Sequence, residues 1–194
     1  MSTERDMLDA LHARYAQASQ GESVRWACAE HVRAHASFDA KACDFMAQDL
    51  WPSKGLHLHG HEVKVSRADW LRELAQPEKA EALRRFCDKW WLVVSDKAIV
   101  KDDLPDGWGL MVVTGGTVRV AKAAPLLTPE PHPATFRASL LRATAKTNAR
   151  RGSVHATLTA TIARRDAEIT RLNDLLAHNR PFYDRRFTTP PGGP

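Results

Sequence analysis

The chain has 194 residues, 43% of them apolar, and a net charge of +5, which suits one cored domain with an appendage. No stretch approaches the roughly 20 apolar residues of a membrane span, and the charged start does not resemble a signal peptide. Three widely spaced cysteines fit neither a zinc ribbon nor a disulfide framework, so we expect a cytoplasmic protein with reduced thiols.

The first third of the chain is predicted to consist of a helix followed by strands. Residues 3–19 carry apolar side chains at helical spacing and should form a helix. Loose alternation predicts a strand over 23–33, and a short strand at 43–47 leads to a turn at 51–55. The clearest strand covers 56–65, where apolar and polar side chains alternate.

The region after this strand continues with helices and strands. Helices are expected over 67–75 and 78–88, and the continuous apolar run at 90–95 predicts a strand buried on both faces. Two further strands, 108–113 and 117–122, flank a hairpin turn at Gly115-Gly116.

The remainder is predicted to be a basic helical appendage. Residues 125–133 contain four prolines, and helices should follow at 134–149 and 153–178 with a break at Gly152. From Thr128 onward the chain carries 11 Lys and Arg against 5 Asp and Glu, which predicts contact with nucleic acid or, with equal weight, a solvated helix. The second helix suits tight packing or a homodimer through a short coiled coil, because apolar residues recur at spacings of three, four and seven: Leu158, Ile162, Ile169, Leu172 and Leu176.

The tripeptide Glu62-Val63-Lys64 is the strongest candidate for chemistry. Side chains alternate along a strand, so the acid and the amine share one face while Val63 turns to the other. An antiparallel hairpin with the preceding strand would bring Asp44 beside Glu62. Mg²⁺ or Mn²⁺ suits such a site, with the two carboxylates and the Val63 carbonyl as ligands and Lys64 orienting water or stabilising the phosphorane. A bare Glu-x-Lys is also common on solvated strands.

The order of Asp44 and then Glu62-Val63-Lys64 resembles the PD-(D/E)XK nuclease superfamily. The string EVKVSRADWLREL (62–74) looks like the MmcB-like DNA-repair nucleases and related phage-encoded proteins. The resemblance implies an α/β, restriction-endonuclease-like core and metal-dependent DNA cleavage, with Asp44 and Glu62 as ligands and Lys64 as the catalytic lysine. Cys43-Asp44 replaces the Pro-Asp of the superfamily name. Many members add a further Glu, for which Glu30 is the candidate, with Glu22 behind it.

The resemblance, which covers roughly residues 23–125, and the proline-containing segment after it set the expected domain boundaries. We expect a PD-(D/E)XK nuclease-like domain at 1–125, a linker at 126–133, a basic helical extension at 134–180 and a disordered tail at 181–194. DNA phosphates and bases would be contacted by four side chains around the active strand: Ser66, Arg67, Trp51 and Lys54.

Several alternatives remain open at this stage. His57, His59 and His61 alternate along the active strand and suit either a transition-metal site or ordinary, partly buried histidines on the face opposite Glu62. The principal expectation is a metal-dependent DNA nuclease in repair, recombination or phage DNA processing. A catalytically silent nucleic-acid-binding or assembly protein that retains the fold is the alternative.

Overall fold

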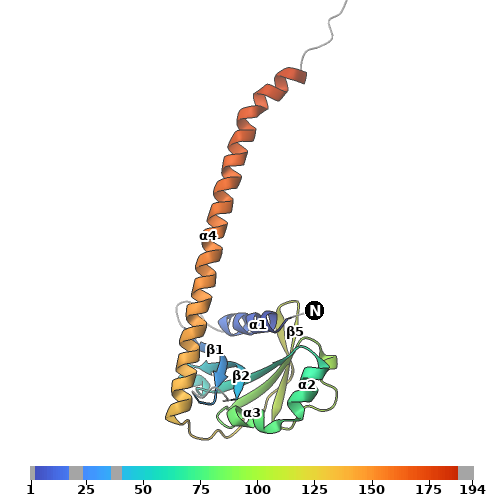
Figure 1. The fold of residues 1–194 in the computed structure, drawn as a ribbon, viewed down its shortest axis with the longest axis vertical. Coiled ribbons are helices and arrows are strands. Elements are labelled where there is room, and N and C mark those ends of the chain that lie inside the picture. Colours follow the sequence, from blue (N-terminus) through green and yellow to red (C-terminus); the bar gives the residue numbers. More distant parts are fainter. Residues whose placement is uncertain (1–2, 18–23, 36–40, 188–194) are drawn as a thin grey trace, which may run out of the picture. The chain divides into compact units, whose positions relative to one another are not determined.

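The computed structural model describes residues 3–17, 24–35 and 41–187, which form an α/β structure around one mixed sheet (Figure 1). The predicted helices and strands before residue 125 are confirmed in type and lie within a few residues of their expected positions. In chain order the elements are α1 (Glu4–Gln17), β1 (Trp26–Arg33), β2 (Ala42–Asp49), η1 (Pro52–Lys54), β3 (Leu58–Lys64), α2 (Arg67–Leu74), α3 (Pro77–Arg84), β4 (Lys89–Val94), η2 (Lys97–Ile99), β5 (Trp108–Thr114), β6 (Thr117–Lys122) and α4 (Ala134–Phe187).

The six strands follow one another in the sheet in their order along the chain. Strands β1, β2 and β3 form an antiparallel meander, β3, β4 and β5 run parallel, and β6 returns antiparallel through a tight turn. The turn contains Gly115 and Gly116 with φ of 56° and 75°, which glycine adopts without steric strain. A parallel pair requires a crossover, and α2 and α3 supply it between β3 and β4.

Helices cover both faces of the sheet, and each face has its own core (Figure 1). Alternation along β4 decides which face each tryptophan joins, so Trp90 packs toward α2 and α3 while Trp91 packs toward α1. Strand β4 is buried along nearly its whole length, as its continuous apolar run predicts. Leu92, the next residue of β4, pairs with Glu62 of β3 and belongs to the core on the α2–α3 face.

The proline-containing segment after β6 packs against the compact unit instead of separating two domains. The amide of Leu127 donates to the carbonyl of Asp88 at 2.8 Å, and His132 Nε2 lies 2.8 Å from the carbonyl oxygen of Phe86. Phe136, in the first turn of α4, is fully buried in the α2–α3 core. The expected boundary at 125 is therefore wrong, because the compact unit continues to residue 148.

The second unit begins at residue 149 and is a continuation of helix α4. The predicted break at Gly152 is wrong, since one glycine costs only about 1 kcal/mol in a helix interior and its neighbours favour helix. The helix extends to Phe187, into the stretch predicted to be disordered, and 188–194 lie outside the described residues. Throughout the described ranges, no helix combines the length and the apolar character that a membrane crossing requires.

Candidate functional site

Asp44 and Glu62 meet where strands β2 and β3 begin to separate. The last paired residues before this point are Phe45 and His61, and one step further along the same register Asp44 faces Glu62. Directly opposed residues of an antiparallel pair present their side chains on one face. Here Asp44 Oδ2 also accepts a hydrogen bond of 2.8 Å from the Val63 amide, which ties its carboxylate to β3. The hairpin geometry predicted for Asp44 is thus present.

Lys64 lies beside Glu62 on the same strand face, as strand alternation predicts. Its Nζ is 3.3 Å from Glu62 Oε2 and 3.0 Å from Oε2 of Glu73, a residue of α2. The side chain of Lys64 is only 13% exposed, so these contacts are poorly screened by water. The lysine therefore bridges two carboxylates from different elements.

Glu73 is a component of the site that the sequence patterns did not reveal. The helix α2 buries Glu73 together with Trp70, which is three positions earlier and on the same helical face. Its Oε2 contacts Lys64 and, at 3.5 Å, Lys79 of α3, whereas its Oε1 is buried and has no hydrogen-bond partner among the described residues. The sequence signal that could have revealed Glu73 was its position three residues after a tryptophan in a predicted helix, which places both on the same helical face.

The charges in this cluster are strongly coupled. Burial, followed by repulsion from Asp44, raises the pKa of Glu62 well above its ordinary value. Burial also acts to lower the pKa of Lys64, but attraction to Glu62, Asp44 and Glu73 outweighs it and the pKa ends above its ordinary value. Lys64 therefore stays charged. The adjacent carboxylates of Asp44 and Glu62, together with the buried Glu73 Oε1 that has no hydrogen-bond partner among the described residues, favour the binding of an additional cation.

The cluster opens into a pocket of about 440 Å³ between β3 and helices α2 and α3. Both acidic and basic side chains line it, and Glu62, which is not part of the lining, is 4% exposed. The charged lining residues are Glu4, Asp44, Lys64, Asp69, Arg72, Glu73 and Lys79.

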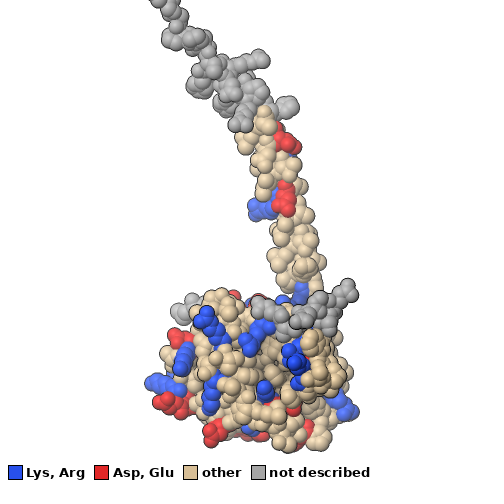
Figure 2. Space-filling model, turned by 180° about the vertical axis from the view of Figure 1, so that it is seen from behind, with Lys and Arg blue, Asp and Glu red and all other residues tan. Residues whose placement is uncertain are grey.

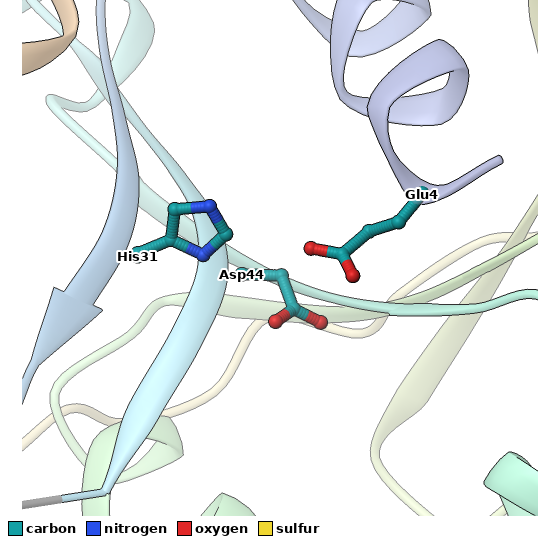
Figure 3. Close-up of side chains that lie close together, drawn as sticks. All are labelled: Glu4, His31 and Asp44. Atoms are coloured by element: carbon teal, nitrogen blue, oxygen red, sulfur yellow. The ribbon is translucent and has the colours of Figure 1, made fainter.

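A second group of donors, Glu4 and His31, meets at Asp44 (Figure 3). Glu4 at the start of α1 and His31 of β1 each bring one donor atom within 4.8 Å of the others and of Asp44. His31 has φ of 51°, in the left-handed region, and lies between two residues that pair normally with β2. Such local strain is found preferentially at functional sites. Asp44 therefore belongs to both groups that have the donor chemistry of a cation site.

Glu30, the predicted additional acid, is used elsewhere. Its carboxylate is buried and lies 2.8 Å from Arg5 Nη1 and 2.7 Å from His12 Nε2, both on α1. The attraction of Glu30 raises the pKa of Arg5 further above its ordinary value, so the pair holds α1 to the sheet as an ion pair. The catalytic role expected of Glu30 stays a prediction, and Glu4 is the acid of the first helix that lines the pocket. Glu22 lies outside the described residues.

Ser66 and Arg67 have structural partners at the start of α2. The Ser66 hydroxyl caps the helix by accepting from the Asp69 amide at 3.1 Å and donates to the carboxylate of the same residue at 2.7 Å. Arg67 forms an ion pair with Asp103 and donates to the carbonyl of Ile99 at 3.0 Å. These contacts occupy the groups that were expected to hold DNA phosphates.

Trp51 and Lys54 lie at the opposite end of the hairpin from the pocket. They follow the end of β2 and precede β3, whereas the pocket is at the other end of both strands. The six steps from Leu58 to Lys64 correspond to roughly 20 Å of strand. In addition, the Arg25 guanidinium lies 5.4 Å from the centre of the Trp51 ring. Trp51 and Lys54 therefore do not lie beside Ser66 and Arg67, and contact of all four with DNA stays a prediction.

The histidines of β3 lie on the α1 face, opposite the carboxylates, as predicted. Tyr15 Oη is 3.2 Å from His59 Nδ1 and 2.8 Å from His61 Nε2. Burial lowers the pKa of His59 to about 3 and that of His61 well below its ordinary value. Both imidazoles are neutral at physiological pH and act as members of a buried polar network with Tyr15.

Comparison with known proteins gives information about the fold alone. No family model matches the chain, and no curated protein matches it. A solved structure from Silicibacter pomeroyi, described as a protein of unknown function, is 21% identical and superposes with a TM-score of 0.54. The match covers 78% of this chain and 89% of that one. The α/β arrangement thus has a counterpart of similar extent.

Proposed function

We propose that the chain is a divalent-metal-dependent nuclease of the PD-(D/E)XK type that hydrolyses phosphodiester bonds in DNA. The observation that carries the proposal is the meeting of Asp44, Glu62 and Lys64, in which Asp44 and Lys64 line the pocket and Glu62 is buried beside Lys64. Two carboxylates and a lysine supply the ligands and the charge that phosphoryl chemistry requires.

The order of elements supports the same proposal. The nuclease fold that the sequence resembles has the order helix, three strands, helix and strand. The chain has this order from α1 to β4, with Asp44 on the second strand and Glu62-Val63-Lys64 on the third. The position of each residue within its strand therefore agrees with the role that the resemblance assigns to it.

The donor set fits a hard divalent cation. One oxygen of Asp44 is engaged by the Val63 amide and one oxygen of Glu62 by Lys64, and the two carboxylates share a hydrogen bond that a cation between them would replace. Mg²⁺ takes a small number of carboxylate oxygens and keeps several waters, which a pocket of about 440 Å³ can hold. When bound, such an ion supplies Lewis-acid chemistry, polarising a phosphate and acidifying water.

The remaining side chains of the pocket have distinct tasks in this proposal. Lys64, held by Glu62 and Glu73, is positioned to orient water or to stabilise negative charge that develops on the phosphate. Lys79 and Arg72 line the outer part of the pocket and are 41% and 76% exposed, which suits contact with flanking phosphates. Figure 2 shows further Lys and Arg side chains across one face of the compact unit.

The proposal is tested by a cleavage assay on single-stranded, duplex and branched DNA with Mg²⁺, Mn²⁺ or EDTA. We expect cleavage by the wild type in either metal, none in EDTA, and a loss of at least about 100-fold in Lys64→Ala and Glu62→Gln. Lys122→Ala is the matched control, because Lys122 is exposed on the far edge strand β6. Equal cleavage by all four proteins, or none by the wild type, contradicts the proposal. Binding of DNA without cleavage instead favours a catalytically silent nucleic-acid-binding protein.

A further inference from the structure

The second unit of the chain presents an apolar stripe along α4. Six aliphatic side chains between residues 158 and 176 are between 45% and 70% exposed, and Leu175 is one of them. The other five form the stripe: Leu158, Ile162, Ile169, Leu172 and Leu176. A single helix in water is only marginally stable, and most helices in proteins depend on packing of such a face. The stripe therefore requires a partner surface.

The spacing of the stripe identifies the kind of partner. With Ile162 at position a of a heptad, Ile169 and Leu176 are also at a, and Leu158 and Leu172 are at d. Of the four a positions between 155 and 176, Ile162 and Ile169 are β-branched, and the other two are His155 and Leu176. β-Branched residues at a with Leu at d favour a parallel, two-stranded coiled coil. The 22 residues from 155 to 176 span three heptads and about 33 Å. A parallel pair of identical helices stacks each of the five aliphatic residues on its own copy.

Charge complementarity supports a second copy of this chain as that partner. Arg165 occupies the remaining d position, and Asp166 the adjacent e position. Side chains at i and i+1 do not face each other on one helix, so Arg165 and Asp166 of the same chain cannot form an ion pair with each other. In a parallel dimer, a d side chain packs beside the e position of the other helix. Each Arg165 then meets the partner's Asp166, twice per dimer.

We propose that residues 155–176 pair with the same segment of a second chain as a parallel, two-stranded coiled coil, with Arg165 and Asp166 bridging the two helices. This interface is independent of the compact unit and of the proposed nuclease activity. Each assembly would therefore carry two copies of the pocket.

Sedimentation equilibrium of the full chain over a dilution series tests the assembly. We expect a mass twice the 21.6 kDa of one chain for the wild type. Ile162→Glu combined with Ile169→Glu should shift it to the mass of one chain and reduce helical circular dichroism. Ala167→Glu, which adds a charge at position f on the other side of the same helix, should remain a dimer. A monomeric or trimeric wild type, or a dimer that survives both isoleucine substitutions, overturns the proposal.

Two further variants test the register and the direction of the helices. Arg165→Asp should weaken the dimer, and adding Asp166→Arg should restore it by exchanging the two charges. Leu158→Cys should form a disulfide-linked dimer on mild oxidation, since identical d positions come within disulfide distance only in a parallel pair. The wild type, with its three native cysteines, is the control for background cross-linking. A dimer in which Leu158→Cys does not cross-link overturns the parallel arrangement.

Discussion

Replacing Glu62 with Gln tests the electrostatics of the site without requiring a known substrate. Burial and the neighbouring Asp44 raise the pKa of Glu62 well above its ordinary value of 4.5. Between pH 4.5 and this raised pKa, the folded protein binds more protons at Glu62 than the unfolded chain does. The free energy of unfolding must then fall as the pH rises through this window, by up to about 1.4 kcal/mol per pH unit.

Glutamine keeps the shape of the side chain but does not titrate. The difference in unfolding free energy between Glu62→Gln and the wild type should therefore rise with pH, in favour of the variant, with the same slope of up to about 1.4 kcal/mol per unit. Lys64 remains paired with Glu73 at 3.0 Å, so its charge stays compensated in the variant. Taking the difference between the two proteins removes the titration of the buried histidines.

Urea unfolding between pH 5 and 8.5, followed by tryptophan fluorescence, measures this difference. At a Mn²⁺ concentration 100 times its dissociation constant, the wild type should gain about 2.7 kcal/mol, and the variant should gain far less. Glu78→Gln is the control, because Glu78 is exposed on α3. A pH-independent difference for Glu62→Gln, or equal stabilisation of both proteins by Mn²⁺, would refute the reasoning.

Three further substitutions probe the surroundings of the site by urea denaturation. Lys64→Ala should lower the free energy of unfolding by about 3 kcal/mol at pH 8, because it leaves buried carboxylates without their cation; a change below experimental error would contradict the buried pairing. Asp103→Ala should lower it by about 1–3 kcal/mol, since the buried Trp70 indole donates to Asp103 at 2.8 Å. Gly60→Ala should lower it by about 1–3 kcal/mol, since a Cβ there would lie 2.3 Å from the fully buried ring of Trp90. An unchanged denaturation midpoint would contradict the Trp70–Asp103 hydrogen bond in the first case and the close packing of Gly60 against Trp90 in the second.

The sequence by itself determined the type and approximate position of the elements of the compact unit. It also determined that Glu62 and Lys64 share a face and that His59 and His61 lie on the other. These features depend on the two-residue period of a strand and the 3.6-residue period of a helix, both of which are local properties of the backbone. The Asp44–Glu62 contact was predictable to the extent that two consecutive strands tend to form a hairpin.

Only the tertiary structure decided which partner each charged side chain takes. Glu30 meets Arg5 and His12 because α1 packs against the sheet, and Glu73 reaches Lys64 because α2 folds back over β3. The same packing extends the compact unit to residue 148. A buried charge takes whichever opposite charge the packing places within reach, and that choice depends on the whole fold, whereas periodicity depends on a few neighbouring residues.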